Sequence, residues 1–486
     1  MTRRPRAKDA GLRAKDAGFS VVLAVFSILI LLTLGIAMVS LIVEDSDLSV
    51  VHVLENQAFY AAHAGTEYAM VKLAANWSWG GLASPGKNVG AGYFWIAPPD
   101  AVDETGAALP AGRKRVISTG VVGNTTRAIQ VQISQGMIST YAGTGTNGYT
   151  GDGGAATAAQ VGRPEGVAVA SNGDVYIADT ANNVIRKVAA ATGIITTVAG
   201  TGSPGSTGDG GAATAAKLKS PEDVFVASNG DLYIADTMNH EIRKVTAATG
   251  VITRVAGTGS PGSTGDGGAA TVALLKQPAG IEVAANGDMY IGDTLNDRVR
   301  KVTASTGIIS AYAGTGTPGY TGDGGAATSA RLSGPEGLVL SNGDLYVADT
   351  GNNVIRKITA STGIITTFAG TGTAGSTGDG GAATSARLSA PQAIDVSPAG
   401  DFYIADTGNH KIRRVQGGSL IITTIMGTGT AGFSGDGGPA TAAQTDSPRG
   451  IAIASTGAYY IGARNNNRIR KVTGLFSIVA WVETRT

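Results

Sequence analysis

Acidic and arginine side chains recur along this chain in blocks of 56 or 57 residues. Each block opens on a Gly-Asp-Gly-Gly tetrapeptide, whose aspartates are Asp152, Asp209, Asp266, Asp323, Asp379 and Asp436. A second aspartate ends a β-prone segment at Asp179, Asp236, Asp293, Asp349 and Asp406, and arginines recur at Arg186, Arg243, Arg300, Arg356, Arg413 and Arg470. Carboxylates form strong hydrogen bonds with guanidinium groups and with turn N–H groups, so we expect buried aspartate–arginine pairs and fixed turns rather than catalysis.

The Gly-Asp-Gly-Gly loops superficially resemble calcium-binding loops. Calcium takes about six to eight oxygen ligands, usually from several carboxylates, whereas each loop offers one, as at Asp152. We therefore expect the loop aspartates to fix the loops through backbone hydrogen bonds, with calcium binding as the alternative. No metal ion or other cofactor is expected.

Histidine and cysteine are too scarce for most metal or nucleophile chemistry. The chain has four histidines and no cysteine, which excludes disulfides, thiolate zinc sites and cysteine nucleophiles. His240 and His410 occupy equivalent positions three blocks apart, so they cannot share one metal ion. The sequence thus indicates a non-enzymatic protein, and a net charge of +1 with scattered basic residues gives no nucleic-acid footprint.

Each block contains four short β-prone segments separated by turn signals. In the first block they are 167–170, 174–180, 184–188 and 194–200, and Asn172-Gly173 and Asn182-Asn183 provide the first two turns. Four antiparallel strands repeated six times are typical of a β-propeller. The sequence therefore predicts a mainly β fold with a six-bladed propeller over residues 137–486.

Three motifs in the blocks resemble the NHL repeat family: Pro-x-Gly, Asn-Gly-Asp-x-Tyr-Ile-Ala-Asp-Thr and Asn-x-x-Ile-Arg-Lys-Val. The resemblance covers Arg163 to about Val472 and implies a propeller that serves mainly as a recognition surface. The last block departs from the pattern, because Ile461-Gly462-Ala463-Arg464 replaces the Ile-Ala-Asp-Thr of Ile177–Thr180. We expect its turn to be less well anchored, as terminal repeats are often atypical.

The residue after the repeated proline differs from block to block. It is Glu165, Glu222, Ala279, Glu336, Gln392 and Arg449 in turn. If this position opens the innermost strand, the six side chains ring one mouth of the central channel. We predict that Glu165, Glu222, Glu336, Gln392 and Arg449 contribute to a partner site for a cationic or hydroxyl-rich ligand, either protein or glycan. The alternative is that this position is exposed and its residue varies between blocks by sequence drift.

Two segments of the sequence are candidates for the strand that closes the ring. Met137–Gly143 and Leu475–Trp481 both have the character of an outer strand, and one of them must complete the sixth blade. We favour Met137–Gly143, because an N-terminal strand in the C-terminal blade closes the ring and leaves no open edge. In the alternative, Leu475–Trp481 completes the blade and Met137–Gly143 extends the sheet that precedes the propeller.

The N-terminal region predicts a membrane anchor. A basic leader, residues 1–18, precedes 25 residues without a charge, from Phe19 to Val43, which is long enough to cross a bilayer. The positive flank should stay in the cytoplasm, which leaves the rest of the chain outside. Apolar residues continue at helical spacing to about residue 74, which predicts one long helix over residues 19–75.

Two features of this region resemble type IV pilins. Gly18-Phe19 before the apolar run looks like a prepilin cleavage site, and residues 55–69 are similar to the N-terminal domain of PilX-type minor pilins. The major pilins' glutamate at the fifth mature position is replaced by Leu23, which suits a minor or tip subunit. The resemblance implies pilin subunits as partners, the membrane before assembly, and the cell surface or pilus afterwards. An uncleaved signal anchor is the alternative.

A small β domain is expected over residues 76–136. Residues 115–122 and 125–133 alternate apolar and polar side chains on either side of Gly123-Asn124, which predicts a hairpin. Together with Tyr93–Ile96, it predicts a small antiparallel sheet against the long helix. The whole chain thus reads as a non-enzymatic, pilus-associated surface protein with a propeller as its binding or adhesive head. The alternatives are a membrane-anchored extracellular propeller enzyme of the lyase or hydrolase type and a structural spacer in a filament.

Overall fold

The computed structural model describes residues 54, 56–64, 69, 81–89, 92–100, 108–109, 113–122, 124–134, 136–474 and 477–485. The predicted leader, the Gly18-Phe19 processing site and the apolar run to Val43 lie outside these residues. Within them, residues 54 and 56–64 are helical, and no helix is long and apolar enough to cross a membrane.

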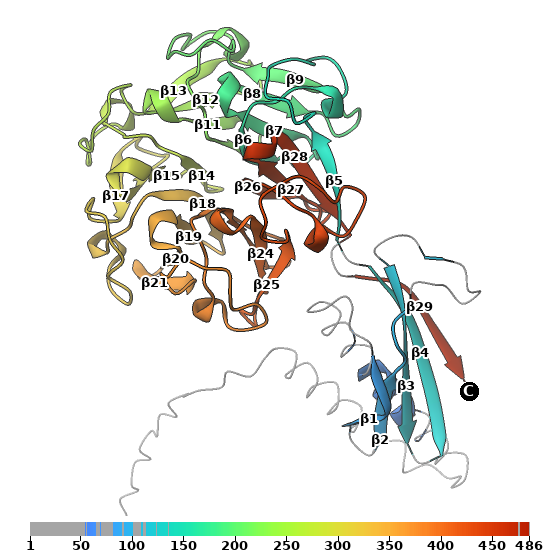
Figure 1. Ribbon diagram of the computed structural model, residues 1–486. Helices are drawn as coiled ribbons and strands as arrows, with labels where there is room; N and C mark the ends of the chain where they lie inside the picture. The colour runs from blue at the N-terminus through green and yellow to red at the C-terminus, as the bar shows by residue number, and fades with distance from the viewer. Residues whose placement is uncertain are drawn as a thin grey trace, which may run out of the picture. The chain divides into compact units, whose positions relative to one another are not determined.

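Residues 137–473 form six four-stranded antiparallel sheets arranged as the blades of a ring (Figure 1). Blades one to three consist of β6 (Pro164–Val169), β7 (Val175–Asp179), β8 (Val184–Val188) and β9 (Ile195–Ala199); β10 (Asp223–Val226), β11 (Leu232–Asp236), β12 (Glu241–Val245) and β13 (Ile252–Ala256); and β14 (Gly280–Val283), β15 (Met289–Asp293), β16 (Arg298–Val302) and β17 (Ile309–Ala313). This arrangement confirms the mainly β fold and is that of a six-bladed propeller.

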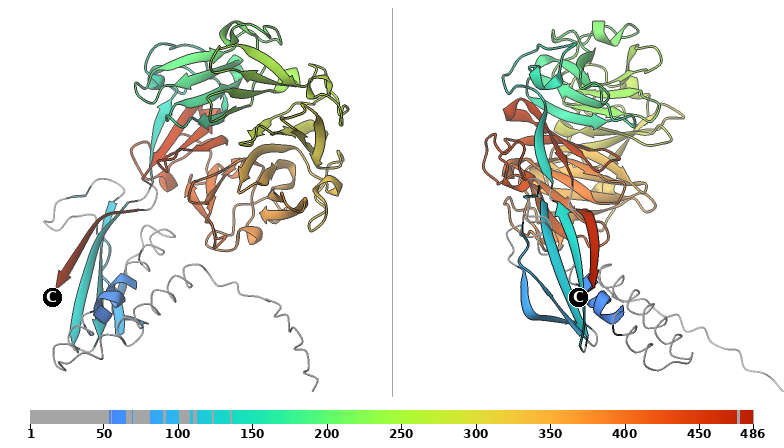
Figure 2. Two further views of the ribbon diagram at one scale, coloured as in Figure 1. Left: turned by 180° about the vertical axis from the view of Figure 1, so that it is seen from behind. Right: turned by 90° about the vertical axis from the view of Figure 1, so that its right-hand side faces the viewer.

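Blades four to six repeat the pattern. They consist of β18 (Pro335–Ser341), β19 (Asp344–Asp349), β20 (Val354–Thr359) and β21 (Ile364–Ala369); β22 (Pro391–Val396), β23 (Phe402–Asp406), β24 (Lys411–Val415) and β25 (Ile422–Met426); and β26 (Pro448–Ile453), β27 (Tyr459–Ala463), β28 (Arg468–Thr473) and β5 (Met137–Ala142). Figure 2 shows the ring from behind and from its edge. The first strands of neighbouring blades, such as β6 and β10, contact one another, so they surround the centre of the ring.

Short 3-10 turns connect the strands. Within each blade one turn joins the second strand to the third, at Thr180–Asn182, Thr237–Asn239, Thr294–Asn296, Thr350–Asn352, Thr407–Asn409 and Arg464–Asn466. A second set follows the Gly-Asp-Gly-Gly loops, at Ala156–Ala158, Ala213–Ala215, Ala270–Val272, Ala327–Ser329, Ala383–Ser385 and Ala440–Ala442. The first alanine of each of these is buried, so the turn fixes the loop to the propeller body.

Each hydrophobic cluster draws on two neighbouring blades. In one of them, Ile185 and Ala199 of blade one pack with Leu218, Ile234 and Ile252 of blade two. A single blade therefore cannot bury its own apolar face, and stability comes from stacking repeats around the ring.

The N-terminal strand β5 closes the ring. It pairs with β28 from Met137↔Thr473 to Ile138↔Val472 and on to Ala142↔Ile469. The favoured closure, with Met137–Gly143 in the sixth blade, is thus confirmed, and β28 is not left as an open edge.

A separate five-stranded sheet has the order β1-β2-β3-β4-β29. Its strands are β1 (Leu82–Val89), β2 (Gly92–Ile96), β3 (Arg113–Val122), β4 (Thr125–Ser134) and β29 (Ser477–Arg485). The predicted hairpin around Gly123-Asn124 is confirmed by the pairing of Val122 with Thr125. A Cβ built at Gly120 of β3 would collide with the backbone of Ala58 and Ala62, so the helix packs directly against this sheet.

The last strand differs from the sequence prediction. The prediction extends the propeller to residue 486, but β29 pairs with β4, from Ser477↔Ser134 to Arg485↔Arg127. The propeller therefore lies in the chain between two adjacent strands of the small sheet, as an insertion. The physical reason is that closure by β5 fills the only vacant place in blade six, which leaves β29 to pair elsewhere.

Candidate functional site

The six recurring arginines are fully buried and form one layer of ion pairs in each blade. In blade two, Arg243 Nη2 lies 2.7 Å from Asp209 Oδ1 and Nη1 lies 3.4 Å from Asp236 Oδ2. Blades one, three, four and five repeat both pairs. The predicted buried aspartate–arginine pairs are confirmed.

The Gly-Asp-Gly-Gly aspartates join their loops to strands. Besides its arginine, Asp152 accepts the Thr197 N–H at 3.1 Å, and Asp323 accepts the Thr367 hydroxyl at 2.6 Å. These aspartates therefore accept hydrogen bonds from side chains as well as from the expected backbone N–H groups. A guanidinium already bound to the carboxylate disfavours a calcium ion there. The described residues contain no group of three or more His, Asp or Glu side chains placed to hold a metal ion.

The strand-end aspartates fix the turns, as predicted. Asp236 accepts the Lys219 N–H at 2.7 Å and the Asn239 side-chain amide at 2.8 Å. Burial raises the pKa of Asp236 to about 7, against the lowering effect of those hydrogen bonds. The next residue, Thr237, donates its hydroxyl to the Pro278 carbonyl of the following blade at 2.8 Å. The same threonine–proline bond links each of blades one to five to its neighbour.

His240 and His410 connect blades and do not form a site. Both have left-handed backbone conformations, with φ of 57° and 55°. His240 Nδ1 accepts the Gln277 N–H at 3.0 Å, and His410 Nδ1 accepts the Ser447 N–H at 3.1 Å. Asn183, Asp297, Asn353 and Asn467 make the same bond with a side-chain oxygen. The histidines are therefore substitutes for Asn and Asp at a capping position.

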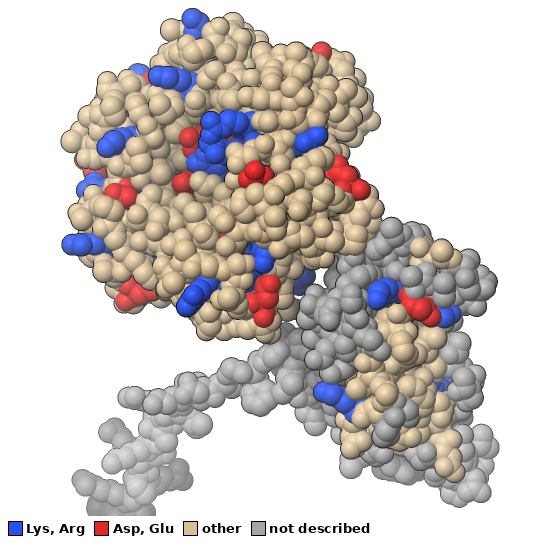
Figure 3. Space-filling view, viewed as in Figure 1, with Lys and Arg blue, Asp and Glu red and all other residues tan. Residues whose placement is uncertain are grey.

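The residues after the repeated prolines come together at a central cavity of about 310 Å³, which all six of them line. Arg449 Nη1 lies 2.5 Å from Glu165 Oε2, and Nη2 lies 3.1 Å from both Glu222 Oε2 and Glu336 Oε2. Gln392 donates to Glu336 Oε1 at 3.3 Å. Figure 3 shows basic and acidic side chains together at the centre of this face of the ring. We call Glu165, Glu222, Ala279, Glu336, Gln392 and Arg449 the mouth ring.

The mouth ring is less exposed than the sequence suggested. The side chains of Glu165, Glu336 and Arg449 are only 3%, 14% and 15% exposed, so drift at an exposed position does not describe them. Burial raises the pKa of Glu165 to about 7 although Arg449 lowers it, and burial also raises the pKa of Glu222. The ion pairs with Arg449 thus offset the effect of burial on these carboxyl groups only in part.

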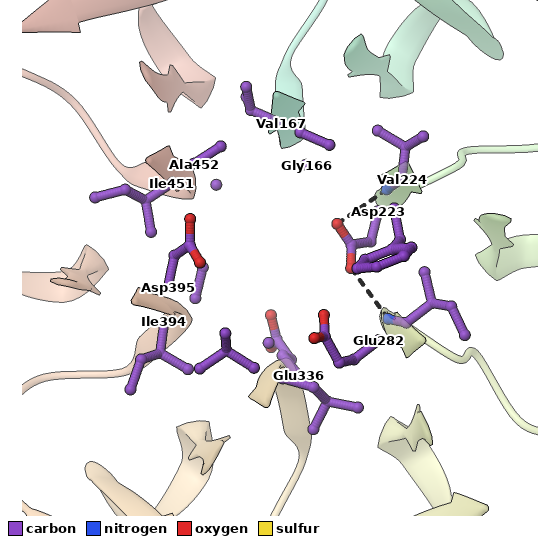
Figure 4. Close-up of a pocket in the computed structure, with 18 of the residues that line it drawn as sticks. Gly166, Val167, Asp223, Val224, Glu282, Glu336, Ile394, Asp395, Ile451 and Ala452 are labelled. Carbon is purple, nitrogen blue, oxygen red and sulfur yellow. Dashed lines mark hydrogen bonds between the residues drawn. The ribbon is translucent and has the colours of Figure 1, made fainter. Parts of the chain in front are cut away.

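A second set of carboxylates lines the same cavity beyond the mouth ring (Figure 4). Asp223 accepts the Ile281 N–H at 3.0 Å, Asp395 accepts the Ile453 N–H at 2.7 Å, and Glu282 accepts the Leu340 N–H at 3.3 Å. Each acid thereby satisfies a backbone group on the inner strand of another blade. Burial raises the pKa of Asp223 to about 6 and that of Asp395 to about 7, and it raises the pKa of Glu282 well above its usual value.

Sequence reasoning missed these three acids. The available signal was the same kind of variation that marked the mouth ring. The second residue after the proline is acidic only at Asp223, and the fourth only at Glu282 and Asp395. Small or apolar residues fill those positions in the other blades.

The sixth blade makes a different contact with blade one. Ala463 and Arg464 replace the usual aspartate and threonine, so Arg470 pairs only with Asp436 among the described residues. Arg464 Nε instead lies 2.6 Å from Glu165 Oε1 in blade one. The turn lacks its carboxylate, as expected, but an ion pair replaces the threonine–proline bond across the last junction.

Six blades around a channel, closed by an N-terminal strand, define a β-propeller protein. A family model described as the Teneurin NHL domain matches residues 122–207, and the NHL repeat model matches residues 332–358 and 388–415. We therefore identify the chain as an NHL-repeat β-propeller protein, related to NHL repeat-containing protein 2 and to teneurin NHL domains. The matched residues begin at 122 and lend no support to the pilin resemblance.

Individual proteins are similar to part of this chain. SUPPRESSOR OF QUENCHING 1 from Arabidopsis thaliana is 31% identical over 266 residues, which cover 52% of this chain and 25% of that protein. NHL repeat-containing protein 2 from Bos taurus is 30% identical over 280 residues, covering 51% of this chain and 38% of that protein. The match thus spans well under half of either relative. A structural genomics protein of unknown function from Bacteroides thetaiotaomicron shares the fold, with a TM-score of 0.53 at 17% identity, over 78% of this chain and 87% of its own.

Proposed function

We propose that this chain is a non-enzymatic binding protein whose propeller captures a protein or glycan ligand at the mouth ring. The observation that carries the proposal is the convergence of charged and polar side chains from five blades on one cavity. Concave sites with a few convergent polar groups are the usual place for a ligand. Carboxylates outnumber arginines there, which favours a cationic or hydroxyl-rich partner.

The pilin-like N-terminus gives the proposed location. The sequence from Gly18 to Ala69 supports a minor pilin that is held in the inner membrane before assembly and reaches the cell surface or pilus with other pilin subunits. In that setting the propeller is an adhesive head. Labelling of isolated filaments with an antibody against the propeller tests this location: label at the tips supports a head, and label along the shaft supports a spacer.

Glycan and peptide arrays probed with the full chain test the binding function. We expect a ligand that is lost when Glu222 and Glu336 are both changed to Gln, because these two carboxylates are the less buried acids of the mouth ring. Glu241→Gln is the matched control, since Glu241 is buried in blade two and pairs with Arg254 outside the channel. Equal capture by the double variant and the parent would place the ligand site elsewhere.

A further inference from the structure

The mouth ring already holds a guanidinium group, supplied by the chain itself. Arg449 of blade six donates from Nη1 to Glu165 of blade one and from Nη2 to Glu222 of blade two and Glu336 of blade four. The two nitrogens at the end of one planar fork thus meet three carboxylates from three blades. An ammonium group concentrates its donors on a single atom and cannot span these positions in the same way.

Two of the three carboxylates, those of Glu165 and Glu336, are held in place by other side chains. Arg464 fixes the second oxygen of Glu165, and Gln392 fixes the second oxygen of Glu336. Glu165 is also buried, with its side chain only 3% exposed. These contacts do not depend on Arg449, so the receptor geometry is expected to persist when that guanidinium leaves. Such preorganisation lowers the cost of binding a replacement.

The carboxyl groups that line the cavity also favour a cationic ligand over an anion. Three glutamates of the mouth ring face Arg449 and Arg464, and the cavity behind them adds Asp223, Glu282 and Asp395. The three added acids have backbone N–H groups as their hydrogen-bond partners and no ion pair among the contacts of the described residues. An anionic ligand would have to compete with the three mouth-ring glutamates for Arg449.

We infer that the mouth ring is a receptor for the guanidinium group of an arginine side chain on a protein partner, and that Arg449 occupies this receptor until the partner's arginine replaces it. The inference rests on the proposed binding function and narrows the ligand to a protein that presents an arginine. Arg449 then competes with ligands for the mouth ring and excludes cations that bind there weakly.

The test removes the internal guanidinium and supplies one from solution. Arg449→Gln in the full chain introduces the residue that blade five carries at the same position, Gln392. Binding of n-butylguanidinium is measured by calorimetry and by the shift in thermal unfolding of the propeller. We expect the variant to bind at least tenfold more tightly than the parent, and to prefer n-butylguanidinium over n-butylammonium by at least tenfold.

Two further variants locate the site. In the Arg449→Gln background, Glu222→Gln should abolish binding of n-butylguanidinium, whereas the control Glu241→Gln should leave it unchanged. If Arg449→Gln does not fold, Arg449→Lys replaces it, because lysine keeps the charge but lacks the fork. The lysine variant should bind n-butylguanidinium more tightly than the parent does.

Equal affinity of the folded variant for both probes would overturn the inference, because the site would then accept any cation. Affinity no better than that of the parent would overturn it as well. Neither result depends on the array experiment. A ligand without arginine that needs Glu222 and Glu336 would leave the proposed function intact while refuting the guanidinium receptor.

Discussion

At the scale of single residues, one buried hydroxyl lies without a partner in the core of the sixth blade. Thr445 is fully buried and its Oγ1 has no hydrogen-bond partner among the described residues, whereas the same position holds Val161, Leu218, Leu275, Leu332 and Leu388 in the other blades. A buried unpaired polar group costs about 1–3 kcal/mol. This threonine is therefore a local weakness at the blade that closes the ring.

Thr445→Val should stabilise the propeller. The change keeps the shape of the side chain and removes the unpaired hydroxyl, so we expect the free energy of unfolding to rise by about 1–2 kcal/mol. Valine is compatible with this position, because Val161 occupies it in blade one. Thermal unfolding of the full chain, followed by near-ultraviolet circular dichroism, measures the change. A lower melting temperature would mean that the hydroxyl has a partner after all.

His240 should make the propeller less stable in acid. Burial, with help from Lys219 and Lys276, lowers its pKa below the usual 6.5. The unfolded chain therefore takes up the proton first. The contribution of this residue is complete above pH 6.5 and is lost as pH falls through the lower folded-state pKa, when protonated Nδ1 can no longer accept the Gln277 N–H.

His240→Asn provides the measurement. Asn183 and Asn353 make the same bond with an oxygen that does not titrate in this range. The melting temperature of the variant, relative to the parent, should rise as the pH is lowered from about 7.5 to about 5.5, the range that brackets the ordinary histidine pKa. A constant difference would show that protonation of His240 does not affect folding.

At the scale of elements, the repeats could be predicted from the sequence because each strand and turn is encoded by local residues. The segments 174–180 and 184–188 correspond closely to β7 and β8, with the turn at Thr180–Asn182 between them. The strand that pairs with β29 could not be predicted from the sequence. The apolar alternation of β29 fits any open sheet edge, and its pairing with β4 depends on tertiary structure. Position in the sheet is a non-local property.

The candidate site could be predicted only in part from the sequence, for the same reason. The variable position after the proline pointed to the mouth ring, but the ion pairs within it join residues such as Arg464 and Glu165, which lie 299 positions apart. From the sequence alone, Arg464 was therefore interpreted as a departure from the repeat pattern in an atypical terminal repeat. The three acids behind the ring gave a signal of equal strength at neighbouring positions.

Closure by β5 makes Ile138 a critical contact. Its side chain is 1% exposed and packs with Val472 and Tyr459 in the cluster between blades five and six. Ile138→Ala should lower the free energy of unfolding of the propeller by about 2–5 kcal/mol, which chemical denaturation of the full chain measures. Deletion of residues 477–486 should leave the melting temperature of the propeller unchanged, because β29 belongs to the small sheet. The opposite pattern would refute the closure by β5.

At the scale of the whole molecule, the pilin hypothesis depends on processing of the N-terminus. Gly18-Phe19 lies between the basic leader and the apolar run, so we expect the mature protein to begin at Phe19. Intact-mass measurement and N-terminal sequencing of surface material decide this. A mature chain that still carries residues 1–18 would point to a simple signal anchor.

The insertion of the propeller between β4 and β29 has a mechanical consequence. Tension between the small sheet and a captured partner would enter the ring through two connections, which end at Met137 and Thr473. These residues are paired, so β5 and β28 are pulled side by side from the same end and their mutual hydrogen bonds are not peeled apart. The load then passes from β28 to β27 across five residue pairs in shear, which must yield together. A propeller inserted in this way would transmit force without separating β5 from β28.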